Sequence, residues 1–148
     1  MFNSGHIYLG YFYLILILIS LSLSVSADEK KAAPEAIQGT TKVSAEGVLN
    51  LAEKIPDLIL IDARIAGDRK QGYIEGSISL PDIDTNCNTL AQIIPKKGSP
   101  VLFYCNGVKC GRSVISSRIA VGCGYKNIYW FRGGVEEWKA KGFPSIKK

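Results

Sequence analysis

The segment from Cys105 to Arg112 combines a possible nucleophile with the residue types of an anion-binding loop. It follows an apolar run that ends at Tyr104, and it precedes a stretch with helical spacing, so a loop between a strand and a helix is expected. Backbone N–H groups at the start of a helix attract anions, and Lys109 and Arg112 add positive charge. A thiol in such surroundings ionises more readily than a free cysteine, whose pKa is about 8.5. The pattern therefore indicates Cys105 as a thiolate nucleophile that needs no histidine.

A second cysteine, Cys110, lies five positions after Cys105. Two interpretations of it stay open. It could be a resolving thiol that attacks an oxidised or sulfur-loaded Cys105 and closes a disulfide, or it could pack beneath the loop. Cys123 is expected in the core near a helix end, and Cys87 is expected as an exposed thiol in a polar loop. The spacings of the four cysteines lack the paired ligands of a zinc site, so no metal is expected.

The single histidine of the chain, His6, lies in the N-terminal segment. Catalytic Cys–His or Ser–His pairs and imidazole metal ligands are therefore not expected in the rest of the chain. The 18 basic and 13 acidic residues give a net charge of +5, which favours small anionic substrates. Because these charges are scattered along the chain, they argue against binding to nucleic acid.

The N-terminal segment, residues 1–27, contains no Lys, Arg, Asp or Glu, and residues 7–25 are mostly apolar. Val25 and Ala27 are small residues at the positions that a secretory cleavage site after Ala27 requires. A signal peptide and a periplasmic or secreted location are therefore expected. The alternative is an uncleaved membrane anchor, because a span needs about 20 apolar residues. Residues 28–40, which are charged and rich in Ala, are expected to form a mobile leader.

Residues 41–148 are expected to form one α/β domain. Apolar runs that predict strands alternate with stretches that predict helices, and this order is typical of a mainly parallel sheet. Ser44 is expected to cap the first helix. Functional sites in such sheets lie at the carboxyl ends of strands, where Cys105 is expected. The expected strands are residues 58–61, 76–80, 101–104 and 128–131, and the expected helices are 45–53, 89–94, 113–121 and 135–141.

Four segments, taken in order, resemble the signatures of the rhodanese family, and the resemblance covers roughly residues 40–146. It implies a rhodanese-like α/β fold, with a mainly parallel central sheet and helices on both faces. Two departures are evident. Tyr73 replaces the usual His, and Arg112 follows Cys105 by seven positions where the family's common loop has five. The four segments are LILIDAR (58–64), GYIEGSI (72–78), the Cys105 loop with Arg112 and Ser113, and the closing GYKNI (124–128) with GGVEEW (133–138).

The resemblance implies a sulfurtransferase that works without a cofactor. Its Cys105 thiolate would take a sulfane sulfur from a small anionic donor such as thiosulfate, form a persulfide, and pass the sulfur to a thiol, cyanide or protein acceptor. Asp62 is expected to be structural, and Arg64 is expected to form an ion pair. The residues expected to bind the donor are Asn106, Gly107, Val108, Lys109, Cys110, Gly111 and Arg112.

Three other functions stay open. The first is a thiol redox or sulfur-carrier protein that uses Cys105 and Cys110, which could rest as a disulfide in an oxidising compartment. The second is a non-catalytic module that binds anions. The third is an enzyme acting on oxyanions, such as a phosphatase or an arsenate reductase, although the Arg of those loops follows the Cys by six positions. Contact with a membrane is expected only if the N-terminal segment stays uncleaved.

Overall fold

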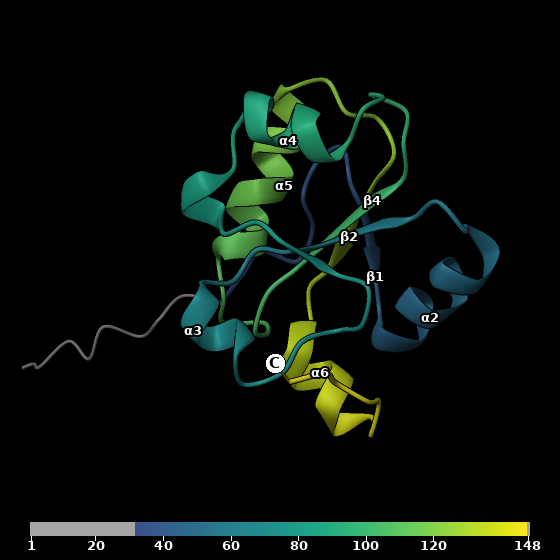
Figure 1. Ribbon diagram of the computed structural model, residues 1–148, viewed down its shortest axis with the longest axis vertical. Coiled ribbons are helices and arrows are strands. Elements are labelled where there is room, and N and C mark those ends of the chain that lie inside the picture. Colours follow the sequence, from purple (N-terminus) through teal and green to yellow (C-terminus); the bar gives the residue numbers. More distant parts are fainter. Residues whose placement is uncertain (1–31, 148) are drawn as a thin grey trace, which may run out of the picture. The chain divides into compact units, whose positions relative to one another are not determined.

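The computed structural model describes residues 32–147 and contains a five-stranded sheet (Figure 1). The strand order is β1-β5-β4-β2-β3, and all four neighbouring pairs are parallel. The expected α/β fold with a mainly parallel sheet is therefore confirmed. The strands are β1 (Thr41–Val43), β2 (Ile59–Asp62), β3 (Ile78–Ser79), β4 (Val101–Tyr104) and β5 (Ile128–Phe131). The helices are α2 (Ala45–Lys54), α3 (Ala66–Arg69), the 3₁₀ helix η1 (Asp82–Asp84), α4 (Cys87–Ile93), α5 (Arg112–Gly122) and α6 (Gly134–Ala140).

The expected N-terminal signal peptide or anchor lies outside the described residues. Within residues 32–147, no helix has both the length and the apolar character that a membrane crossing requires.

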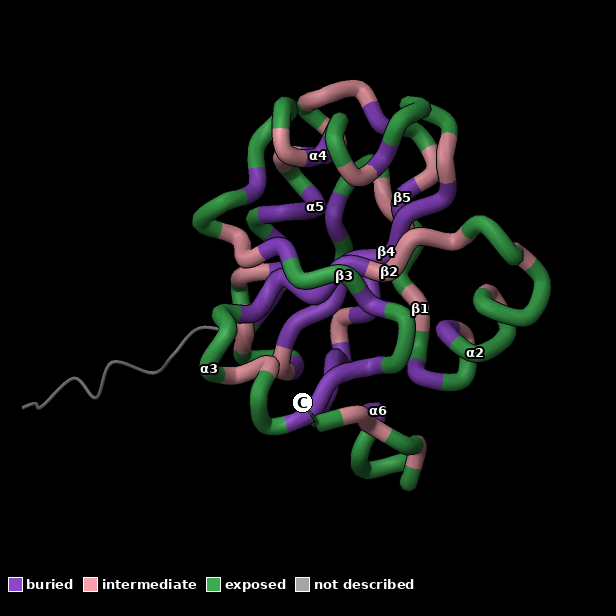
Figure 2. Tube along the Cα trace, viewed as in Figure 1, coloured by how far each residue is buried: buried purple, intermediate pink, exposed green. Residues whose placement is uncertain are grey.

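Strand β4 is the centre of the sheet and is buried on both of its faces. Val101 and Phe103 point to one face and pack in a cluster with residues of α4 and α5. Leu102 and Tyr104 point to the opposite face and pack with residues of α2 and α6. Figure 2 shows that the buried parts of the chain gather along the central strands. Since burial of a large apolar side chain stabilises the fold by about 1.5–3 kcal/mol, these two clusters fix the position of β4.

Capping side chains determine where two of the helices begin. The Ser44 hydroxyl accepts a hydrogen bond from the Gly47 amide at 3.2 Å, so α2 starts at Ala45 as expected. Helix α4 starts at Cys87, two residues before the expected start, because Asn86 and Thr89 form a reciprocal capping box.

The described part of the leader, residues 32–40, is not mobile as expected, because two of its side chains are buried against the domain. Ala33 and Ile37 are buried beside Val114 and Trp130. The Ala33 amide donates to the Val108 carbonyl at 2.7 Å, and the Arg132 guanidinium donates to the carbonyl of Ala33 at 2.9 Å. Ala33 and Ile37 cover the indole of Trp130. Because their neighbours in the sequence are charged or polar, the sequence pattern does not predict this packing.

Cys87 also differs from the expectation, because it is not a free thiol. It forms a disulfide with Cys123, with the Cα atoms 5.5 Å apart. Cys123 also packs against the apolar cluster under α4 and α5, which agrees with its expected place in the core. The disulfide therefore joins the start of α4 to the end of α5.

This disulfide should contribute measurably to stability. In the Cys87→Ser/Cys123→Ser double variant, the free energy of unfolding should fall by about 2–4 kcal/mol, because the crosslink restricts the unfolded chain. Chemical denaturation without reductant measures the loss. The wild type and the variant should converge when both are fully reduced. Equal stability without reductant would contradict the prediction.

Candidate active site

Cys105 lies directly after the central strand β4, at the carboxyl edge of the sheet, and only 1% of its surface is exposed. Residues 105–111, here called the Cys105 loop, lead from this strand into α5. The start of α6 holds the beginning of the loop. The Val135 amide donates to the Cys105 carbonyl at 3.0 Å, and the Glu136 amide donates to the Asn106 carbonyl at 2.7 Å. The nucleophile predicted from the sequence is therefore a buried residue with a fixed backbone.

Gly134 makes this docking of α6 possible. Its φ of +55° lies in the left-handed region that favours glycine, and a Cβ atom there would overlap the Cys105 carbonyl. Gly107 is equally close to its neighbour, because a Cβ atom there would overlap the Glu136 carboxylate. At Gly134, the loop and α6 are therefore in backbone-to-backbone contact, which only a residue without a side chain allows, whereas Gly107 packs against the Glu136 side chain.

Cys110 forms a disulfide with Cys105, and their Cα atoms are 6.2 Å apart. This distance lies within the usual range for disulfides of about 4.4–6.8 Å. The Cys110 amide donates to the Gly107 carbonyl at 2.9 Å, which closes a turn inside the loop. Cys110 is partly exposed, whereas Cys105 is buried. The structure thus brings the two sulfur atoms together and makes the second one the accessible member.

The backbone of the loop offers unused hydrogen-bond donors. Among residues 32–147, no acceptor receives a hydrogen bond from the amides of Asn106, Gly107, Val108 or Lys109. The first amides of α5 follow in the chain and also lack a partner within the helix. Such a set of amides is suited to an anion, because N–H groups supply partial positive charge without a counterion.

The two cations of the loop region have different surroundings. Lys109 is exposed and makes no salt bridge with the described residues. Arg112 donates to the Asp68 carboxylate at 2.5 Å and lies 3.7 Å from the Asp82 carboxylate. Its charge is therefore already compensated, which favours a structural role for Arg112 and leaves Lys109 as the cation available to an anionic donor.

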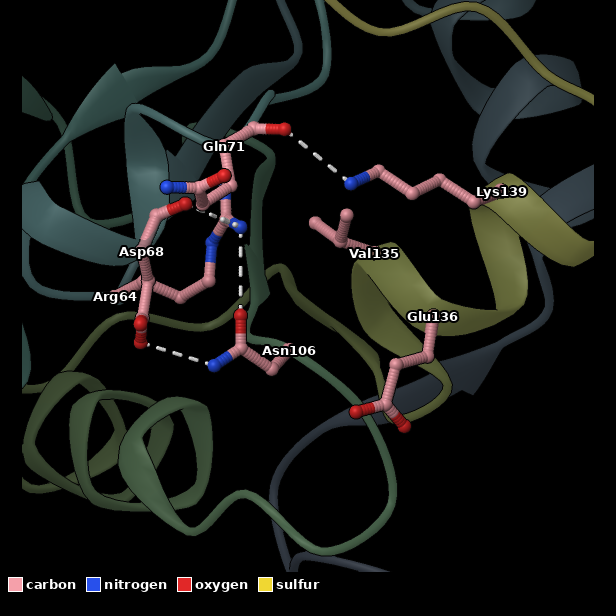
Figure 3. A pocket seen from close by; sticks show the side chains of 7 residues that line it. All are labelled: Arg64, Asp68, Gln71, Asn106, Val135, Glu136 and Lys139. Carbon is pink, nitrogen blue, oxygen red and sulfur yellow. Dashed lines mark hydrogen bonds between the residues drawn. The ribbon is translucent and has the colours of Figure 1, made fainter.

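Asn106 connects the loop to α3 through its side chain (Figure 3). Its Nδ2 donates to the Asp68 carboxylate at 2.9 Å, and its Oδ1 accepts from Arg64 at 3.4 Å. The hydrogen bond from Asn106, helped by the Arg112 ion pair and partly opposed by burial, lowers the pKa of Asp68 below its ordinary value. Asp68 therefore stays ionised and holds both Asn106 and Arg112 in place.

Asp62 is the centre of a buried network beneath the loop. Its carboxylate accepts hydrogen bonds from Arg64 at 2.7 and 2.8 Å, from Arg69 at 2.9 Å, and from the Tyr104 hydroxyl at 3.0 Å. Burial, followed by the charge of Asp62, raises the pKa of Tyr104 to about 12. The expected ion pair of Arg64 is confirmed, and the contacts of Asp62 agree with a structural role. Arg69 and Tyr104 could not be predicted as members of this network, since neither spacing nor composition marks them in the sequence.

Two cavities flank the Cys105 loop. The first, of about 160 Å³, includes Asn106 in its wall, and the second, of about 250 Å³, includes Val108. Figure 3 shows the first cavity between Asp68 and Arg64 on one side and Val135 and Glu136 of α6 on the other. Cys105 lines neither of these cavities. Within the described part of the chain, no cluster of His, Cys, Asp and Glu has the arrangement of a metal site.

The docking of α6 can be tested with two matched glycine variants. Gly134→Ala should displace the Cys105 and Asn106 carbonyls, whereas Gly142→Ala places a methyl group in open space at a similar φ of +73°. Both changes introduce left-handed strain of about 1–2 kcal/mol. Only Gly134→Ala should lose more stability than this strain accounts for. In the reduced form of that variant, Cys105 should also react faster with an alkylating reagent, as peptide mapping would show. Equal behaviour of the two variants would mean that the contact does not position Cys105.

The lowered pKa of Asp68 predicts a dependence of stability on pH. An ionised carboxylate with a depressed pKa stabilises the folded state above its unfolded pKa of about 3.9, and this contribution disappears as the pH falls through the folded value. Asp68→Asn should therefore be less stable than the wild type at pH 7, and the difference should shrink below about pH 4. Denaturation curves across this range measure it. A constant difference at all pH values would contradict the assignment.

The comparisons with known proteins agree with this geometry. Residues 44–141 match the family model of the rhodanese-like domain. The rhodanese domain-containing protein CG4456 of Drosophila melanogaster is 32% identical over 98 residues, which cover 58% of this chain and 86% of the relative. The uncharacterized protein YibN of Escherichia coli K12 is 22% identical over 114 residues, which cover 76% of this chain and 78% of the relative.

Solved structures show the same fold. A thiosulfate sulfurtransferase from Pseudomonas aeruginosa matches 73% of this chain with a TM-score of 0.64 and 25% identity, but this chain spans only 20% of that protein. The polysulfide-sulfur transferase homodimer from Wolinella succinogenes matches 74% of this chain and 80% of its own, with a TM-score of 0.61 and 23% identity. Since the family model matches most of the described residues and the sheet has the same architecture, the chain belongs to the rhodanese-like domain family.

Proposed function

We propose that the protein is a sulfurtransferase in which Cys105 carries the sulfur. The position of Cys105 carries this proposal, because it is the first residue after the central strand and opens a loop with unpartnered amides. Membership of a family that includes sulfurtransferases supports it, and so does the likeness to the thiosulfate sulfurtransferase from Pseudomonas aeruginosa.

The first half of the reaction loads the cysteine. The Cys105 thiolate attacks the outer sulfur of thiosulfate, the sulfur–sulfur bond of the donor breaks, and sulfite leaves with the bonding electrons. The product is a Cys105 persulfide anion, so the total charge is unchanged. The loop amides and Lys109 suit both the dianionic donor and this anion, because they provide positive potential close to Cys105.

The second half returns the enzyme to its starting state. A thiophilic acceptor such as cyanide or a thiolate attacks the outer sulfur of the persulfide and leaves with it, and the Cys105 thiolate is regenerated. This step needs no general base, which is consistent with the absence of histidine from residues 32–147. Because Cys105 can take up sulfur only as a free thiolate, the Cys105–Cys110 disulfide has to be reduced before the first half of the reaction, and the reduced protein is the active form.

A thiol redox protein is the second candidate function. The disulfide between Cys105 and Cys110 favours it, because these two sulfurs exchange between a dithiol and a disulfide without a larger rearrangement of the fold. A redox protein of this kind would reduce or oxidise partner thiols and would show no preference for a sulfane donor.

An exported location is part of the proposal. All four cysteines are paired in the structure, and structural disulfides persist in oxidising compartments. The apolar N-terminal segment provides the route, either as a cleaved signal peptide or as an anchor.

Thiosulfate labelling of the reduced protein tests the sulfurtransferase function. When the reaction is quenched within the first turnover, the protein should carry the mass of one added sulfur atom on the peptide that contains Cys105, and it should form thiocyanate when cyanide is present. Cys105→Ser should lose both properties, whereas Cys87→Ser/Cys123→Ser should keep them, because that disulfide joins α4 to α5 and not the loop. If Cys105→Ser keeps the transfer activity, or if the sulfur maps to another cysteine, the proposal is wrong.

A further inference from the structure

We propose a second activity for the Cys105 loop, in which Cys110 resolves the Cys105 persulfide and releases its outer sulfur as sulfide. This inference rests on the proposed persulfide. It adds a different product, because the sulfane sulfur is reduced to hydrosulfide and is not handed to an acceptor. The protein would then couple the consumption of a sulfane donor to the oxidation of a dithiol.

The position of Cys110 supports the reaction. A resolving thiol has to reach the inner sulfur of the persulfide, which is the Cys105 Sγ atom. The disulfide shows that the folded loop brings the Cys110 Sγ atom to that sulfur, with the Cα atoms 6.2 Å apart. The same atoms that meet in the disulfide are therefore those that have to meet in the resolving step.

The loop is held in this arrangement by contacts that do not depend on the disulfide. The Cys110 amide donates to the Gly107 carbonyl, and the Val108 carbonyl accepts from Ala33 of the leader at 2.7 Å. At the start of the loop, the carbonyls of Cys105 and Asn106 are bound by α6. Since these backbone contacts fix both ends of the Cys105–Cys110 segment, Cys110 should stay close to Cys105 after reduction, at a high effective concentration.

The resolving step needs no reactant besides the Cys105 persulfide and the Cys110 thiol. Cys110 attacks the Cys105 Sγ atom, a bond forms between the two cysteine sulfurs, and the bond to the outer sulfur breaks. The outer sulfur leaves as hydrosulfide with the bonding electron pair and the thiol proton of Cys110. The two cysteines become a disulfide, so the sulfane sulfur is reduced and the cysteine pair is oxidised.

A dithiol reductant then reduces the Cys105–Cys110 disulfide. The difference in exposure of the two cysteines determines which sulfur the reductant attacks. Cys105 is 1% exposed, whereas Cys110 is partly exposed, so an external thiolate reaches Cys110 first. The mixed disulfide forms on Cys110, and Cys105 leaves as a thiolate beside the loop amides. The second thiol of the reductant closes its own disulfide and frees Cys110. In the complete cycle, thiosulfate and a dithiol give sulfite, hydrosulfide, a disulfide and a proton.

A single-turnover experiment separates this activity from simple transfer. Reduced wild type, Cys110→Ser and Cys105→Ser are freed of reductant, given thiosulfate, and followed by mass spectrometry and sulfide detection. The wild type should release sulfide in proportion to sulfite and should finish with a Cys105–Cys110 disulfide. In Cys110→Ser, the persulfide should persist about tenfold longer or more, without matching sulfide, and cyanide should still convert it to thiocyanate. The Cys87→Ser/Cys123→Ser variant is the matched control and should release sulfide like the wild type.

The outcomes distinguish the two proposals. If no variant gains sulfur from thiosulfate, the proposed sulfurtransferase function fails, and the resolving step fails with it. If Cys110→Ser gains sulfur on Cys105 and its persulfide decays as fast as that of the wild type, only the resolving role is wrong. A persulfide found on Cys110, without sulfide, would also overturn it, because it would show attack at the outer sulfur.

The order of reduction is tested with a monothiol. When the disulfide form is treated with 2-mercaptoethanol and quenched with acid, the adduct should map to Cys110. In dithiothreitol, repeated turnover of thiosulfate should yield sulfide with the wild type, and the yield should fall about tenfold or more with Cys110→Ser. An adduct on Cys105, or equal sulfide from both proteins, would contradict the proposed cycle.

Discussion

The buried carboxylate of Asp62 is the constraint on which the site depends. A charge with no exposed surface is costly unless its partners compensate it, and here Arg64, Arg69 and Tyr104 do so. Arg64 in turn donates to the Gly72 carbonyl at 2.9 Å and to the Asn106 side chain. The carboxyl ends of β2 and β4, helix α3 and the Cys105 loop therefore share one polar network, and removal of its centre would leave buried cations without a counterion.

Arg112, which the sequence predicts as a donor-binding residue, is held by two carboxylates in the structure. Its guanidinium pairs with Asp68 and lies 3.7 Å from the Asp82 carboxylate. The amides of residues 106–109, in contrast, have no acceptor among the described residues. Anion binding by amides depends on the path of the backbone and not on a single side chain, so it is sensitive to Gly107 and Gly134, which allow α6 to pack so closely.

The sequence predicted the features that leave a local pattern. The apolar runs identified β2, β4 and β5, the strand-to-helix transition placed Cys105 at the end of a strand, and Arg64 forms the expected ion pair, with Asp62 as its partner. Features that depend on distant partners were missed. Strand β1 contains Thr41 and Lys42 and has no apolar run, the leader looks polar apart from two residues that pack on Trp130, and the partner of Cys87 lies 36 positions away.

The register of β1 has a consequence for how the chain acquires its structure. Thr41 pairs with Tyr129, so the first strand finds its partner only in the last strand. Pairings between residues so far apart in sequence form slowly, because the intervening chain has to be ordered first. Strand β1 and the leader residues before it, which pack on Trp130, can therefore complete the domain only after β5 has been synthesised.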